Sequence, residues 1–171
     1  LANELADKHQ VIVIALEDGH IPPYYELDRR VQVIYEDVFQ RTKNPILWRI
    51  VRAAARKYQI VLPEWMAKNA YYPAKVIRVL QEKWKKDGYD CLVASTAFCS
   101  ILLGLMAEKL TDVKTIGWHH NSFFIYFRTP GKGAYIQQKL AGNALKRLDA
   151  LVTLTRQDKE AYKRWMNLDA T

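Results

Sequence analysis

The segment Lys114-Thr-Ile-Gly-Trp-His-His-Asn-Ser-Phe-Phe124 changes character halfway along its length. Its first five residues form a short, largely apolar run that predicts a strand. Two histidines, a polar pair and two aromatic residues follow at once. Ligands of open α/β sheets bind beyond the carboxyl ends of parallel strands, and histidine donates, accepts or changes charge near neutral pH, so this order favours a site. A histidine at a strand end can equally be a capped or solvated polar residue, and both interpretations stay open.

Apolar strands alternate with helical segments along the chain. Gln10–Leu16 is a nearly continuous apolar run, as expected of a strand buried on both faces. Further strands are expected at Val31–Tyr35, Cys91–Ala94, Lys114–Trp118 and Ala150–Leu154. Helices are expected at Pro45–Tyr58, Ala74–Lys86, Phe98–Leu110, Tyr135–Leu148 and Thr155–Trp165. We therefore predict an α/β fold with a mostly parallel sheet flanked by helices on both faces, in which the first strand and the last three are neighbours.

Three further segments stand out between these elements. Asn121–Gly133 is a long irregular stretch directly after the histidines, and loops of that length are usually functional or mobile. Thr155 is a candidate N-cap with Asp158 three residues on, a weaker form of the capping box. Tyr58–Tyr72 indicates neither helix nor strand clearly.

The composition is that of one globular domain with a basic surface. Half of the 171 residues are apolar and 12% are aromatic, which excludes a disordered chain. No window reaches the ~18 uncharged apolar residues of a membrane span. A net charge of +8 suits an anionic partner, although solvated helix faces explain most cations in Arg49–Lys57 and Lys75–Lys86. Cys91 and Cys99 lack metal or redox spacing, which favours two buried thiols in a reducing cytosol.

Four passages resemble the N-terminal half of the family 4 retaining glycosyltransferases. They are Leu1–Ile14, Tyr89–Ser95, Thr115–Phe123 and Leu148–Glu160. The likeness covers nearly the whole chain, while each motif is short and degenerate. It implies a Rossmann-like domain, one of two that face each other across a cleft.

The same resemblance implies a fragment truncated at both ends. The family's first strand with its Gly-Gly loop is missing, as is the C-terminal domain that binds the nucleotide-sugar donor. Residues 1–171 are therefore expected to be the acceptor-side domain, inactive by itself and without a cofactor or metal of its own. A vacant strand position would also favour strand-swapped homo-oligomers or marginal stability.

Residue by residue, the resemblance places the family's histidine at His120 and its variable neighbour at His119. His120 is therefore expected to be catalytic, through a hydrogen bond to a donor-sugar hydroxyl. Glycosyl transfer passes through an oxocarbenium-like state, so orientation and electrostatics dominate. His119, Asn121, Ser122 and Phe123 are the expected substrate-binding residues, with strand-end backbone contacts as the alternative role of Asn121 and Ser122. His119 and His120 should face opposite sides, because side chains alternate along an extended strand.

The loop after the histidines holds an aromatic cluster beside Arg128 and Lys132. Its aromatic residues fit a core, a platform for a sugar or apolar acceptor, or a membrane contact: Phe123, Phe124, Tyr126 and Phe127. The resemblance implies a saccharide or lipid-linked acceptor and a role in bacterial cell-surface polysaccharide or glycan synthesis. Together with the charge, it implies a cytoplasmic protein, peripheral at the anionic inner face of the membrane.

Other functional classes lack their motifs. Gly131-Lys-Gly133 is not a dinucleotide-binding G-x-G-x-x-G, and neither a P-loop nor G-x-S-x-G occurs. The four histidines lack the spacing of zinc ligands, and no nucleic-acid-binding signature is present, so no nucleic-acid partner is expected. The leading alternative is a non-catalytic sugar- or partner-binding subunit, because the same fold serves different functions.

Overall fold

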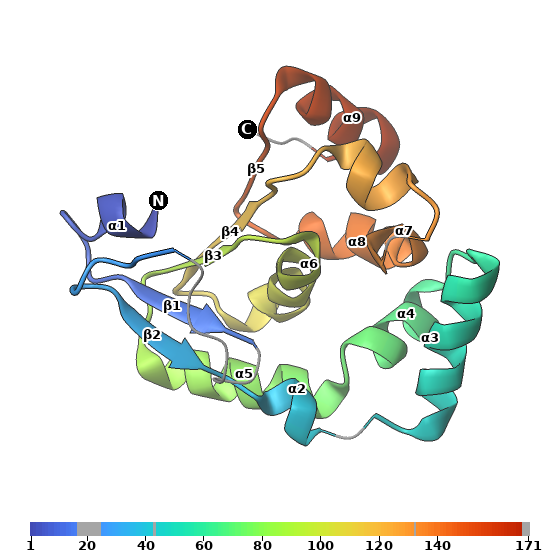
Figure 1. Cartoon of the computed structure of the whole chain (residues 1–171), viewed down its shortest axis with the longest axis horizontal. Coiled ribbons are helices and arrows are strands. Elements are labelled where there is room, and N and C mark those ends of the chain that lie inside the picture. Colours follow the sequence, from blue (N-terminus) through green and yellow to red (C-terminus); the bar gives the residue numbers. More distant parts are fainter. Residues whose placement is uncertain (17–24, 43, 132, 169–171) are drawn as a thin grey trace. The chain divides into compact units, whose positions relative to one another are not determined.

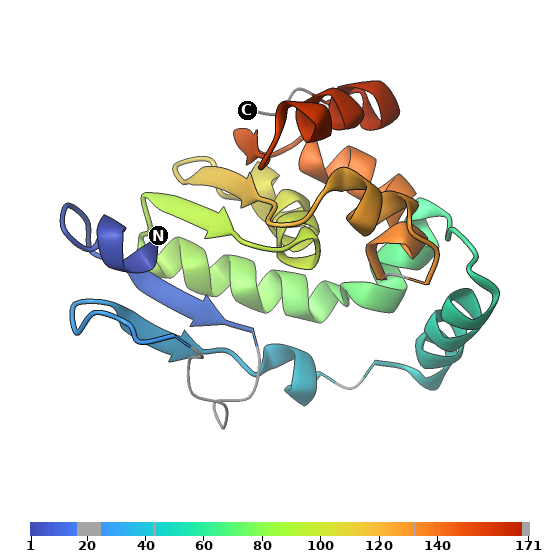
Figure 2. The ribbon, with the colours of Figure 1, turned by 45° about the horizontal axis from the view of Figure 1, so that its top comes forward.

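The computed structural model describes residues 1–16, 25–42, 44–131 and 133–168. Its contacts divide the chain into two compact units, Leu1–Lys43 and Asn44–Thr171, which we name unit 1 and unit 2. Figures 1 and 2 show the elements of each unit. Residues 17–24, which include His20, lie outside the described residues, as does Lys132.

Unit 1 holds a pair of short parallel strands. Strand β1 (Ile12–Ala15) pairs with β2 (Gln32–Tyr35), with Ile12 opposite Gln32 and Ala15 opposite Tyr35. A single turn of helix lies on either side of the pair along the chain, α1 (Ala2–Leu5) and α2 (Val38–Arg41). The parallel pairing of β1 with β2 agrees with the predicted, mostly parallel strand order.

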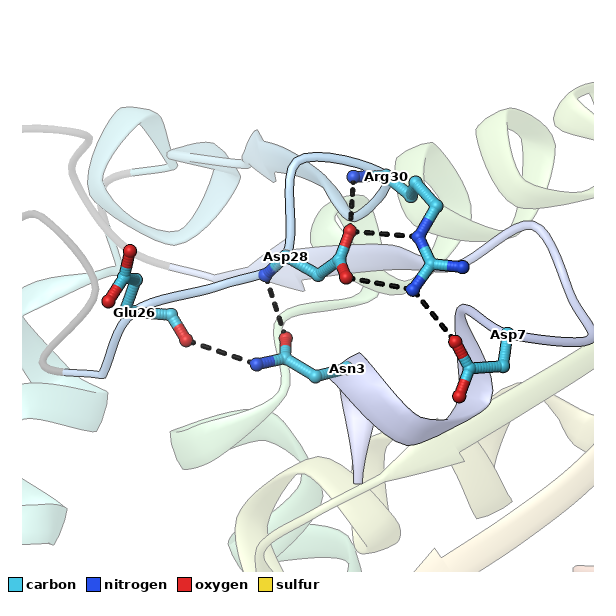
Figure 3. Close-up of polar contacts among 5 residues, drawn as sticks. All are labelled: Asn3, Asp7, Glu26, Asp28 and Arg30. Carbon is cyan, nitrogen blue, oxygen red and sulfur yellow. Dashed lines mark hydrogen bonds and ion pairs between the residues drawn. The ribbon is translucent and has the colours of Figure 1, made fainter.

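A polar cluster joins α1 to the segment that leads into β2 (Figure 3). The Arg30 guanidinium donates to both Asp28 carboxylate oxygens, at 2.9 and 2.8 Å, and to Asp7 at 2.8 Å. The Asn3 amide donates to the Glu26 carbonyl at 3.2 Å and accepts from the Asp28 amide at 2.9 Å. Hydrogen bonds from Arg30 lower the pKa of Asp28 to about 2. The Asp28 carboxylate is therefore charged at neutral pH.

Unit 2 is built on a three-stranded parallel sheet. Its order is β3 (Cys91–Ala94), β4 (Lys114–Trp118) and β5 (Ala150–Val152). Val93 lies opposite Ile116, and Gly117 lies opposite Leu151. Its helices are α3 (Ile46–Tyr58), α4 (Glu64–Tyr71), α5 (Ala74–Asp87), α6 (Ala97–Met106), α7 (Gly133–Ile136), α8 (Gln138–Leu145) and α9 (Arg156–Met166).

Helix α6 is the centre of the core of unit 2. It is apolar on all sides, begins at Thr96, whose side chain accepts from the Cys99 amide at 3.2 Å, and packs against β3, β4 and α8. At Gly104 the two helices approach so closely that a Cβ would lie 2.1 Å from the Ala144 carbonyl oxygen. The absence of a side chain at Gly104 is therefore what allows α6 and α8 to pack at this distance.

Asp149 fixes the start of β5 against the start of β4. Its carboxylate accepts from the Thr115 amide at 2.8 Å and the Thr115 hydroxyl at 2.9 Å, and Lys114 lies 3.3 Å away. These hydrogen bonds, led by that from the Thr115 amide, lower the pKa of Asp149. The aspartate of the Leu148–Glu160 passage thus sets the register of the sheet that carries the candidate site.

The predicted α/β class is confirmed, and several elements match closely. Parallel sheets are flanked by helices, β3 and β4 have the expected bounds, and α5 ends one residue later than expected, before Gly88 with its φ of 69°. The expectation that the first strand neighbours the other three is wrong: among the described strands, β1 pairs with β2 alone. Strands β1 and β2 form a two-stranded sheet in unit 1, and β3, β4 and β5 form a separate sheet in unit 2.

Local contacts account for the other differences. The loop expected at Asn121–Gly133 contains a turn of π-helix, Phe124–Arg128, where the Thr129 hydroxyl donates to the Phe124 carbonyl at 2.9 Å. The helix expected at Tyr135–Leu148 breaks at Gln137, whose side chain donates to the Gly133 carbonyl at 2.9 Å. The ambiguous Tyr58–Tyr72 contains α4, and the helix expected at Phe98–Leu110 continues beyond Met106 as a 3-10 turn.

Cys91 is a further correction. It was expected to be buried, but its side chain is exposed, and Cys99 is half-buried. Along β3 the side chains alternate, so that Leu92 and Ala94 are buried while Cys91 and Val93 point to the more open face of the sheet. Alternation on an outer strand therefore explains the exposed thiol.

Candidate functional site

The predicted site residues follow the carboxyl end of β4, where the chain turns away from the sheet. Trp118 is the last residue of that strand, and the His119 amide still donates to the Val152 carbonyl of β5 at 3.0 Å. The next residues carry the backbone away from the sheet and into the π-helical turn. The segment His119–Phe123 is therefore fixed by the sheet at its start.

His119 is buried in an aromatic cluster. Its side chain is 1% exposed, and its ring lies 5.1 Å from Tyr126, 5.6 Å from Tyr162 and 6.3 Å from Phe127, centroid to centroid. Its Nδ1 shares a hydrogen bond with the Tyr162 hydroxyl of α9. Its Nε2 is buried and has no partner among the described residues. His119 is thus held by the protein interior on one nitrogen only.

Burial makes His119 a neutral side chain. Desolvation lowers its pKa from 6.5 to about 4, and the neighbouring charge of His120 acts in the same direction. Burial also raises the pKa of the Tyr162 phenol, whose hydroxyl therefore stays protonated. The protonated phenol and the neutral imidazole therefore share an uncharged hydrogen bond at Nδ1.

The free energy of unfolding should fall in mildly acidic solution because of His119. The unfolded state binds a proton on this residue below about pH 6.5, while the folded state resists it down to about pH 4. The free energy of unfolding is therefore unaffected by the titration of this residue above pH 6.5. It falls between pH 6.5 and pH 4, by on the order of 3 kcal/mol in total. Urea unfolding at several pH values measures the slope.

The control for this pH dependence is His119→Gln, which removes the titrating group and keeps a hydrogen-bonding side chain. The variant should show a flatter profile between pH 6.5 and pH 4 than the unmodified chain. An equally steep profile in the variant would assign the acid sensitivity to another residue.

His120 lies in different surroundings from His119. It is exposed, and its ring stacks on Trp118 with centroids 5.9 Å apart and planes 24° from parallel. His119 is thus buried and His120 exposed, while the prediction that they face opposite sides, with His120 pointing into an open cleft, stays a prediction. The catalytic role of His120 and the substrate-binding role of His119 stay predictions.

The other three predicted site residues also differ in exposure. Asn121 is exposed, and Ser122 is half-buried with its hydroxyl accepting from the Ile125 amide at 3.3 Å. Phe123 is 1% exposed and packs edge-on against Tyr162 at 4.9 Å. His120 and Asn121 are therefore the adjacent polar side chains of this segment that solvent reaches, while Phe123 belongs to the core.

Asp158 also contacts this segment, although the sequence predicted for it only a role in the cap of the following helix. Its carboxylate accepts from the Phe123 amide at 2.8 Å and from the Thr155 hydroxyl at 2.7 Å, and it is 6% exposed. Thr155 caps α9 as predicted, by accepting from the Asp158 amide at 3.1 Å. Helix α9 thus holds the segment at both ends, through Tyr162 on His119 and through Asp158 on Phe123.

The aromatic cluster of the loop divides between core and surface. Phe123 and Phe127 are buried, Tyr126 is half-buried and Phe124 is 44% exposed. Arg128 lies over the Trp165 ring of α9, 4.1 Å from its centroid. The core interpretation therefore holds for Phe123 and Phe127.

Metal ligands, a hollow elsewhere in unit 2 and membrane-spanning helices are the other features that bear on a site. No three His, Cys, Asp or Glu side chains gather as metal ligands in the described ranges. A hollow at the start of β5, at the opposite end of the sheet from the histidines, is lined by Leu145, Lys146, Leu148, Asp149, Ala150, Leu151, Asn167 and Leu168. Among the described helices, none combines the length and apolar composition needed to cross a bilayer.

The comparison with curated proteins found no match. The family model described as Glycosyltransferase Family 4 matches residues 1–171, the whole length of the chain. This match agrees with the resemblance of the four sequence passages, with the parallel α/β architecture and with the polar segment at the carboxyl end of β4. The chain therefore belongs to Glycosyltransferase Family 4, with a Rossmann-like fold, and its general activity is that of a glycosyltransferase.

Proposed function

We propose that the chain is the acceptor-side domain of a glycosyltransferase that moves a sugar from a nucleotide-sugar donor to a saccharide or lipid-linked acceptor, with retention of anomeric configuration. The observation that carries the proposal is the position of His120 and Asn121. Both are exposed at the carboxyl end of β4, where α/β sheets place their ligands. Family membership gives the reaction class within which these two side chains are interpreted.

The second argument for a catalytic role of this segment is that hydrogen bonds on both sides of His120 fix its backbone. On one side the His119 amide bonds to β5, and on the other the Phe123 amide bonds to the buried carboxylate of Asp158 at 2.8 Å. Catalytic side chains need such support, because misplacement by about 1 Å costs on the order of 100-fold in rate. The backbone that carries His120 is thus fixed on both sides, as a catalytic group requires.

The proposed chemistry uses His120 as a hydrogen-bonding group. As the bond between the anomeric carbon and the leaving nucleotide breaks, positive charge develops on the sugar ring. A hydrogen bond between the imidazole and a sugar hydroxyl orients the ring while the acceptor hydroxyl oxygen forms the new bond and its proton passes to the departing nucleotide phosphate. Asn121 supplies a further donor and acceptor for sugar hydroxyls. We propose no metal or cofactor for residues 1–171, with the nucleotide bound mainly by another domain.

The proposed setting is bacterial cell-surface polysaccharide or glycan synthesis at the cytoplasmic face of the membrane. The net charge of +8 supports an anionic surface near the acceptor. The test is a transfer assay with the enzyme as the cell makes it, labelled nucleotide sugars and lipid-linked glycan acceptors, followed by NMR of the product's anomeric centre. Transfer with retention is expected. Sugar binding without transfer would instead support a binding subunit, and an inverted product would contradict retention.

A further inference from the structure

Helix α3 carries large apolar side chains on its solvent side. Ile46, Leu47 and Ile50 are 72%, 62% and 60% exposed, and Tyr58, the last residue of the helix, is 65% exposed. Side chains four residues apart lie on one helix face, so Ile46 and Ile50 lie together with Leu47 beside them. An apolar helix face usually faces a core.

The opposite side of α3 attaches the helix to unit 2. Ala55 is 2% exposed, and Trp48 meets Trp65 of α4 edge-on with centroids 6.1 Å apart. Arg52 lies over the Tyr71 ring, 5.8 Å from its centroid. Figures 1 and 2 show α3 beside α4 at the edge of unit 2. The helix therefore packs through Trp48, Arg52 and Ala55 and leaves its more aliphatic face outward.

Cations flank this face, and the helix has no acidic residue. Residues 46–58 include Arg49, Arg52, Arg56 and Lys57 and neither Asp nor Glu. Arg49, Arg56 and Lys57 are exposed, while Arg52 is engaged with Tyr71. We define the α3 surface as the exposed side chains of this helix: Ile46, Leu47, Arg49, Ile50, Arg56, Lys57 and Tyr58.

We propose that the α3 surface is a docking site for the anionic surface of a lipid bilayer, with α3 lying parallel to it. Helices that lie at bilayer interfaces bury an aliphatic face among the acyl chains and place Lys and Arg against anionic headgroups. The α3 surface offers both features on one helix. This inference names the place of membrane contact, and it rests on the proposed function only for the presence of a membrane-bound acceptor.

Other occupants fit the α3 surface less well. Two copies of the chain that met through it would bring three cations against three cations, without an acidic side chain on either helix to offset them. Nucleic acid would use the cations, but it offers no apolar phase for Ile46, Leu47 and Ile50. An anionic bilayer satisfies both the aliphatic and the cationic side chains.

Co-sedimentation of the purified chain with lipid vesicles tests the proposal. Binding is expected to vesicles of phosphatidylcholine and phosphatidylglycerol in equal amounts and to be far weaker to phosphatidylcholine alone. The double variant Leu47→Gln, Ile50→Gln should lower the partition coefficient about a hundredfold, because each aliphatic side chain that leaves water contributes about tenfold. Arg49→Gln with Arg56→Gln should lower it roughly thirtyfold, at about fivefold for each cation near an anionic leaflet.

Matched controls lie elsewhere on unit 2. Leu154→Gln removes a side chain that is 58% exposed, and Lys85→Gln with Lys86→Gln removes two exposed cations of α5. These controls should bind vesicles as the unmodified chain does. Absence of binding to anionic vesicles, or equal losses in variants and controls, would overturn the proposal. A dimer in sedimentation velocity that only the α3 variants dissociate would reassign the surface to a second copy.

The proposed reaction and the proposed membrane docking can be refuted independently of each other. Transfer to a soluble saccharide by the complete enzyme should be unchanged in the α3 variants, because α3 carries none of the proposed site residues. Vesicle binding without any sugar transfer would refute the proposed function and leave the docking surface standing. Transfer without vesicle binding would refute the docking surface alone.

Discussion

Gly104→Ala should lower the free energy of unfolding by about 3 kcal/mol. The new Cβ would lie 2.1 Å from the Ala144 carbonyl oxygen and 2.6 Å from its carbonyl carbon, and both atoms belong to the backbone of α8. A flexible side chain could turn away, but backbone atoms move only if α6 and α8 separate. For a chain of this size, a loss of about 3 kcal/mol lowers the melting temperature by roughly 6–12 °C, which thermal unfolding measures.

Gly142→Ala is the matched control for Gly104→Ala. Gly142 lies inside α8, and a Cβ there would have no heavy atom within 4 Å. Alanine is the better helix former by ~1 kcal/mol, so this variant should be equally stable or more stable than the unmodified chain. If Gly104→Ala behaved like Gly142→Ala, close packing of α6 on α8 would not be what position 104 provides.

His120→Ala should lower kcat at least about 100-fold, with little change in KM. The imidazole is proposed to bond to the donor sugar most strongly when charge develops in the transition state, and loss of one such donor typically costs ~10²–10³ in rate. Because the side chain is exposed, the free energy of unfolding should change by less than ~0.5 kcal/mol. Steady-state kinetics of the complete enzyme and urea unfolding measure the two effects.

His119→Ala should show the reverse pattern. Truncation leaves a cavity among Tyr126, Phe127 and Tyr162 and removes the partner of the Tyr162 hydroxyl. Both effects destabilise the fold, together by roughly 2–4 kcal/mol, while activity per folded molecule should persist. Unchanged turnover in His120→Ala together with a collapse in His119→Ala would show that the catalytic role belongs to His119.

The sequence predicted the elements whose signals are local. Apolar runs located β3 and β4 to the residue, and the Thr155 cap located the start of α9. The break at Gln137 and the π-helical turn at Phe124–Arg128 could not be predicted, because hydrogen bonds to the Gly133 and Phe124 carbonyls make them. Periodicity indicates neither of these contacts.

The candidate site was predictable in its position but not in its support. The two histidines follow a strand, which is visible in the sequence, whereas Tyr162 and Asp158 reach the segment from helix α9, 43 and 35 residues further along the chain from their partners. The apolar pattern of α3 likewise predicted a helix, while the rule that such a face turns inward does not hold for Ile46 and Ile50. Contacts between residues far apart in the sequence determine both the support of the site segment and the exposure of the α3 face.

His119 in unit 2 and the ion pair between Asp28 and Arg30 in unit 1 change their protonation in different pH ranges. In unit 2 the neutral ring of His119 lowers the free energy of unfolding as the pH falls from 6.5 toward 4, because the unfolded chain binds a proton there and the folded chain does not. In unit 1 the pKa of Asp28 is lowered to about 2, so its carboxylate keeps its charge, and its bonds to Arg30, until the solution is far more acidic. Mild acid should therefore destabilise the surroundings of the candidate site while the ion pair between Asp28 and Arg30 stays charged.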